Sequence, residues 1–78
     1  MIRPIYEIAY EIRKLWKPVY FGAVPYLDAM CSIDKIDEMY GYDSAKSVVI
    51  YFLGNAKSFK GDDARRLKAE LKVIAGIK

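Results

Sequence analysis

An amphipathic pattern runs through residues 5–16, whose sequence is IYEIAYEIRKLW. Apolar residues recur there at steps of three and four, which places them on one face of a helix. They are Ile5, Ile8, Ala9, Ile12, Leu15 and Trp16. Pro4 suits the first helical turn, where its missing N–H has no partner to lose, and Pro18 stops the helix. The stretch therefore predicts a helix from about Pro4 to Trp16.

Two more apolar stripes with this spacing follow in the C-terminal half. The first predicts a helix that begins after an N-cap at Asp43 and ends near Gly54. Its stripe is Ala45, Val48, Val49, Phe52 and Leu53. The second predicts a helix capped by Gly61 or Asp62 and ended by Gly76. Its stripe is Ala64, Leu67, Leu71, Ile74 and Ala75.

The apolar run from Val48 to Leu53 is also compatible with a strand. A strand needs a partner to satisfy its backbone, and the sequence contains no second run of β type. A buried helix is therefore favoured.

The middle of the chain carries weaker helical signals. They predict a second helix from Pro25 to about Ser32 and a third short helix from Asp34 to Tyr40, followed by Gly41. The buried side of the third helix is expected to be Ile33, Ile36, Met39 and Tyr40. The whole pattern predicts one all-α domain over residues 1–78, a compact bundle of four to five short helices with no sheet. The first, fourth and last helices are expected to supply most of its core.

Composition limits the chemistry of this 78-residue chain. It has one cysteine and no histidine, which excludes an internal disulfide and the common Cys/His zinc sites. Cys31, Ser44, Ser47 and Ser58 therefore have no histidine base, and no glycine-rich phosphate loop is present. We expect no enzyme activity and no cofactor.

Metal binding and membrane association are not expected either. The acidic residues Asp34, Asp37, Glu38 and Asp43 do not have the spacing of a calcium loop. No apolar run approaches the roughly 18 residues of a membrane-spanning helix. The start, residues 1–4, has no basic region followed by a long apolar run, so no secretory signal is predicted. A cytoplasmic location is therefore expected.

Charge is distributed unevenly. Residues 57–78 carry seven basic and three acidic side chains, whereas residues 1–56 carry six basic and seven acidic ones. Helical spacing places Arg65, Lys68 and Lys72 along one edge, and Lys60 precedes them. This edge is a candidate nucleic-acid interface, with Phe59 able to stack on a base or dock on a protein. Arg66 and Glu70 are expected to form an i,i+4 ion pair.

Aromatic side chains are abundant, at 14% of the residues. A small domain cannot bury all of them, and exposed tyrosines are typical of protein interfaces. The candidate interface residues are Tyr6, Tyr10, Tyr20, Tyr26, Tyr42 and Phe59. The same rings could instead form the interface of a homo-oligomer.

Several segments resemble a group of small hypothetical proteins from bacteriophages and mobile elements of Gram-positive and gut bacteria. The segments are IYEIA at 5–9, EIRK at 11–14, VPYLDAM at 24–30, YGYDSA at 40–45 and ARRLKAELK at 64–72. The resemblance covers nearly the whole chain. It implies origin rather than activity, and it transfers no functional residue.

Small phage proteins without catalytic residues commonly bind and block a host factor or bind DNA, so analogy with them gives the expected function. Together with the abundant aromatic residues and the absence of catalytic motifs, this analogy predicts a non-enzymatic accessory protein that binds a host or phage protein, including a host defence component in the manner of an anti-CRISPR. Two alternatives stay open. One is a nucleic-acid-binding protein that uses the basic edge, and the other is a structural homo-oligomer.

Overall fold

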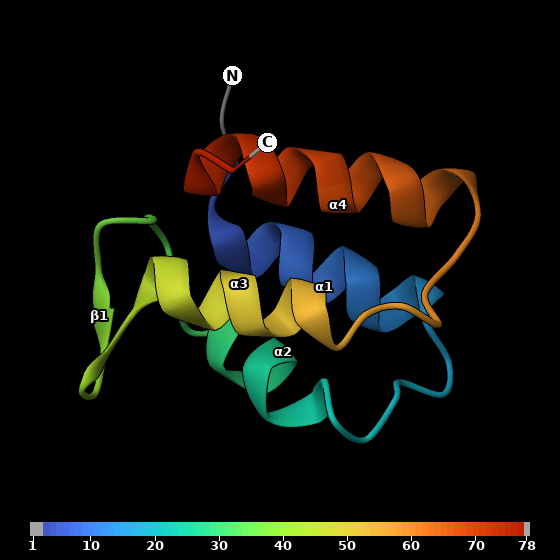
Figure 1. The fold of residues 1–78 in the computed structure, drawn as a ribbon, viewed down its shortest axis with the longest axis horizontal. Coiled ribbons are helices and arrows are strands. Elements are labelled where there is room, and N and C mark those ends of the chain that lie inside the picture. Colours follow the sequence, from blue (N-terminus) through green and yellow to red (C-terminus); the bar gives the residue numbers. More distant parts are fainter. Residues whose placement is uncertain (1–2, 78) are drawn as a thin grey trace.

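Four helices dominate the computed structural model, which describes residues 3–77 (Figure 1). They are α1 (Ile5–Leu15), α2 (Val24–Met30), α3 (Ala45–Gly54) and α4 (Asp62–Ala75). Met1 and Ile2, part of the segment considered for a secretory signal, and Lys78, counted in the C-terminal charge, lie outside the described residues. No helix within residues 3–77 has the length and apolar character needed to cross a bilayer.

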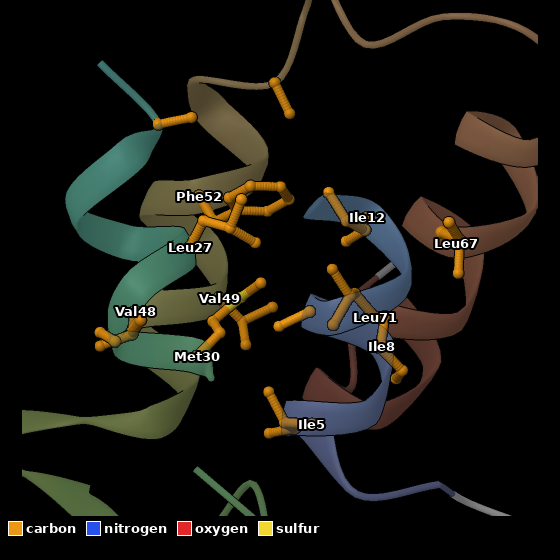
Figure 2. Close-up of a cluster of buried hydrophobic side chains, with 14 of the residues drawn as sticks. Ile5, Ile8, Ile12, Leu27, Met30, Val48, Val49, Phe52, Leu67 and Leu71 are labelled. Atoms are coloured by element: carbon orange, nitrogen blue, oxygen red, sulfur yellow. The ribbon is translucent and has the colours of Figure 1, made fainter. Parts of the chain in front are cut away.

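The helices are arranged as a closed ring around one core. α1 contacts α2 and α4, and α3 contacts the same two helices. In Figure 2, side chains from α2 and α3 on one side face those from α1 and α4 on the other. Phe52 and Val49 of α3 point towards Ile8 and Ile12 of α1 (Figure 2). α1, α3 and α4 supply most of the buried helical residues, as predicted, and α2 adds Leu27, Ala29 and Met30.

The described part of the core is entirely apolar, with no buried polar or charged residue. The stripes predicted for α1, α3 and α4 are buried at most positions, including Ile8, Phe52 and Leu71, each 0% exposed. Leu15 is an exception, because its side chain is 45% exposed. The helical assignment of Val48–Leu53 is confirmed, since this run lies inside α3.

Two helix starts are capped by contacts that the sequence pattern did not indicate. The N–H groups of Ile5 and Tyr6 donate to the carbonyls of Asp34 and Ile33, at 2.9 and 2.8 Å, so the segment after α2 caps α1. At α3 the cap is Ser44, whose hydroxyl accepts the N–H of Ser47 at 3.1 Å. The prediction of Asp43 as this cap was therefore wrong by one residue.

The predicted third helix over residues 34–40 is wrong. Its place is taken by turns and a two-stranded antiparallel hairpin, β1 (Met39–Tyr40) with β2 (Asp43–Ser44). The Glu38 carboxylate accepts the N–H groups of Asp34 and Lys35, which satisfies these donors without a helix. Met39 and Tyr40 are exposed, so no apolar face holds a helix here. Gly41, at φ 64°, forms the hairpin turn instead of ending a helix.

The fold is mostly helical, as predicted, but it is not free of sheet. The helices number four within the described residues, at the lower end of the predicted range. The hairpin projects at one end of the bundle beside the start of α3 (Figure 1).

Candidate interaction surfaces

The aromatic residue nearest the basic C-terminal helix is buried. Phe59 is only 4% exposed, and its ring stacks on Trp16 at 5.1 Å with an interplanar angle of 20°. Trp16 also meets Phe52 edge-on at 6.1 Å. The predictions that Phe59 stacks on a base or docks on a protein are therefore wrong, because the ring belongs to the core.

The cations predicted to form a basic edge do gather. Lys60, Arg65 and Lys68 line one shallow, open pocket of about 320 Å³. Its other lining residues are Phe59, Gly61 and Ala64, so no acidic side chain lines it among the described residues. Lys72 lies one turn beyond Lys68 on the same side of α4. We call Lys60, Arg65, Lys68 and Lys72 the basic edge.

Lys68 occupies the centre of this edge. Its Nζ donates to the Phe59 carbonyl at 2.5 Å and lies 5.8 Å from the centre of the Phe59 ring. Partial burial lowers the pKa of Lys68, and the positive charges of Lys72 and Lys60 lower it further.

The other polar side of α4 is engaged in ion pairs with the rest of the protein. Arg3 holds the Glu70 carboxylate with two hydrogen bonds of 2.8 and 2.7 Å and also contacts Glu11 at 3.0 Å. Arg66 pairs with Glu11 at 2.5 Å and with Asp63 at 3.3 Å. The predicted Arg66–Glu70 pair is therefore wrong, since both residues have partners elsewhere. We call these five residues the ion-pair network.

That network shifts the ionisation of its members. Hydrogen bonding to Glu70 and Glu11 raises the pKa of Arg3. The pKa of Glu70 is lowered mainly by Arg3, and that of Glu11 mainly by Arg66. All three groups are therefore held in their charged forms at neutral pH.

A second surface consists of aromatic rings at the α2–α3 junction and the loop before α2, of which Tyr20, Phe21 and Tyr51 are exposed and Tyr26 is partly buried against the core. Tyr26 of α2 and Tyr51 of α3 lie 5.6 Å apart between ring centres. Tyr20 and Phe21, in the loop, lie 4.8 Å apart. Phe21 is 80% exposed, so most of its side chain is in contact with solvent.

Asn55 lies next to a residue of each ring pair. Its side-chain amide donates to the Tyr51 carbonyl at 2.9 Å. Asn55 and Tyr20 line a pocket of about 370 Å³, together with Gly54, Lys57 and Ser58. The two side chains also approach Gly22, where a Cβ would meet Tyr20 Cε2 at 2.6 Å and Asn55 Oδ1 at 2.9 Å. We call Tyr20, Phe21, Tyr26, Tyr51 and Asn55 the aromatic strip.

The remaining predicted interface tyrosines lie elsewhere. Tyr6 and Tyr10 form a pair on α1 with ring centres 6.1 Å apart, and Tyr42 is fully exposed in the hairpin turn. The sequence therefore indicated Tyr20 and Tyr26 of the strip but did not single out Tyr51 or Asn55. One signal for them was present in the sequence: Tyr51 and Asn55 are four residues apart, on the side of α3 that faces away from its apolar stripe.

Cys31 was considered for catalysis and Glu38 for metal binding. Burial raises the pKa of the Cys31 thiol, which disfavours the nucleophilic thiolate. The Glu38 carboxylate is occupied by two backbone N–H groups. Within residues 3–77, no three His, Cys, Asp or Glu side chains gather in a group able to hold a metal ion.

Comparison of the chain with known protein families, with curated proteins and with solved structures finds no match.

Proposed function

We propose that this chain is a non-enzymatic binding protein that engages another protein through the aromatic strip. The observation that carries the proposal is the strip itself, which contains two aromatic pairs, Tyr20 with Phe21 and Tyr26 with Tyr51, and a pocket lined by Tyr20 and Asn55. Aromatic anchors beside a pocket are typical of the centre of a protein interface, because each ring buries a large area at a small entropic cost.

The strip also contains few charged residues, as the centre of a protein interface does. Of its own residues and those lining the pocket, only Lys57 carries a charge. Charged residues are depleted at interface cores because removing them from water is costly. The packing of Tyr20 and Asn55 over Gly22 orders part of the strip before binding, which reduces the entropy lost on association.

The resemblance to small phage and mobile-element proteins supports a host protein as the partner. A cytoplasmic host defence component is the class we propose to test first, since blocking such a component needs binding and no chemistry.

The proposal is tested with the full chain as bait against host lysate, using two variants. Phe21→Ser with Tyr51→Ser removes two exposed rings, and Tyr10→Ser with Tyr42→Ser removes two exposed rings outside the strip. We expect one stoichiometric host protein to be retained by the wild type and by the control variant. The strip variant should bind it at least about 30-fold more weakly, as expected for interface hot spots.

Gly22→Ala gives an independent variant that removes no ring. Its Cβ forces Tyr20 and Asn55 to move, so partner affinity should fall while the helical content stays unchanged. Recovery of no stoichiometric partner contradicts the proposal. A molar mass that rises with concentration by light scattering, and does so less in the strip variant, assigns the strip to a homo-oligomer instead.

A further inference from the structure

The proposed function leaves the basic edge unused. Its cations have few counter-charges within the protein. Arg65 faces Asp62 at 3.8 Å, and both side chains are more than 80% exposed, so this pair is weak. The pocket between Lys60, Arg65 and Lys68 has no acidic lining among the described residues. Positive charge is therefore concentrated here and directed at solvent.

The edge is also ordered at its centre. The Phe59 carbonyl accepts one proton of the Lys68 ammonium group and fixes its position, which leaves two N–H donors for a ligand. Partial burial of Lys68 and, to a smaller extent, the charges of Lys72 and Lys60 disfavour its ammonium form, and an anion beside Lys68 offsets both effects. The site thus favours an anionic ligand on both geometric and electrostatic grounds.

Its length fits several phosphates rather than one. Arg65 and Lys72 are seven residues apart on α4, which is about 10 Å along the helix axis. A nucleic-acid strand places one phosphate about every 3.4 Å along its axis, so this distance corresponds to about three phosphates. A single free phosphate could contact only part of the edge.

In the described part of the chain, the pocket of the basic edge offers no exposed aromatic ring for stacking on a base. Phe59 is the one aromatic residue lining the pocket in the described structure, and its ring is buried against Trp16. The groups presented at the surface are ammonium and guanidinium groups, which bind phosphate without base information. Base stacking, the usual second component of single-strand binding, is missing from this site.

We propose that the basic edge binds the phosphate backbone of a nucleic acid independently of its sequence. This binding uses α4 and the loop before it, so it does not depend on the aromatic strip. It adds a second contact to a protein whose first partner is a protein.

The test is fluorescence anisotropy of labelled DNA of about 20 nucleotides, as single strand and as duplex, in two unrelated sequences. We expect equal affinity for both sequences. Four phosphate contacts, one for each cation of the edge, predict that affinity falls between about 50 and 200 mM salt by roughly 50-fold for the single strand and roughly 150-fold for the duplex. Poly-glutamate serves as the competing anion, to distinguish a nucleic acid from an acidic protein segment.

Two charge-reversal variants locate the binding. Arg65→Glu with Lys72→Glu changes two exposed cations, and we expect at least about tenfold weaker binding and a salt slope reduced by about 2. Lys14→Glu with Lys17→Glu changes the net charge equally at exposed positions near the end of α1, and should reduce affinity far less. Circular dichroism verifies that both variants keep the wild-type helical content.

Four outcomes overturn the inference. They are no DNA binding at about 50 mM salt, equal losses in the two variants, different affinities for the two sequences, and poly-glutamate that binds as tightly as DNA. Phe21→Ser with Tyr51→Ser should leave DNA affinity unchanged, so failure of the proposed function and failure of this inference are distinguishable.

Discussion

Both polar sides of α4 carry an arginine, but the two arginines are in opposite situations. On one side, Arg66 and Glu70 are joined to Arg3 and Glu11 in the ion-pair network. On the other, Arg65 and Lys72 face solvent beside Lys60 and Lys68. Net charge along the sequence treats all of these cations alike. The comparison shows that only the second side offers positive charge to a ligand, whereas the first connects α4 to α1 and to the segment before it.

The apolar stripe between the two sides should dominate the stability of α4. Leu71→Ala removes a fully buried side chain and should lower the free energy of unfolding by about 2–5 kcal/mol. Val73→Ala, at a position 73% exposed on the same helix, should change it by less than about 0.5 kcal/mol. Urea denaturation measures both. Similar effects for the two variants would mean that charge, rather than burial, holds α4 in place.

The ion-pair network should make stability depend on acidic pH. The pKa values of Glu11 and Glu70 are lowered from 4.5 in the folded protein, so the unfolded chain binds more protons as pH falls. This contribution is complete above the unfolded values and is lost as pH falls through the folded ones.

Glu11→Gln with Glu70→Gln tests this dependence. The double variant should be about 1 kcal/mol less stable than the wild type at neutral pH, because both side chains are partly exposed and screened. The difference should vanish by about pH 2, where the wild-type carboxylates are protonated. A difference that is the same at both pH values contradicts an electrostatic role for the network.

The smallest expected effect is a difference in melting temperature between variants of two adjacent arginines. Arg66→Glu places a second negative charge against Glu11 and Asp63 and should lower the melting temperature by a few degrees. Arg65→Glu, at a highly exposed position, should leave it nearly unchanged. Differential scanning calorimetry at low salt measures the melting temperatures of the two variants. Addition of salt should reduce the difference between them, because it screens the charges. Equal melting temperatures would remove the distinction between the two sides of α4.

Sequence periodicity predicted the parts of the fold that depend on local spacing. The helices containing Ile8, Phe52 and Leu71 are present, and their apolar faces are buried. The hairpin was missed because β1 and β2 have two residues each, too few to show an alternating pattern. Its turn at Gly41 depends on a backbone conformation that also suits the end of a helix.

The candidate surfaces were predicted only in part, for a related reason. Lys60, Arg65, Lys68 and Lys72 could be grouped because three of them share one helix at regular spacing. The aromatic strip could not, since Tyr20 and Asn55 are brought together by the packing of α2 on α3.

By itself, the sequence determined which faces of α1, α3 and α4 are apolar, and hence that this is a mostly helical domain with a common core. Tertiary structure alone decided which aromatic rings and which cations are left at the surface. Phe59 and Phe21 are the same residue type, yet one stacks on Trp16 in the core and the other is 80% exposed. The physical reason is that burial and ion pairing depend on neighbours distant along the chain, whereas helical periodicity depends only on neighbours three and four residues away.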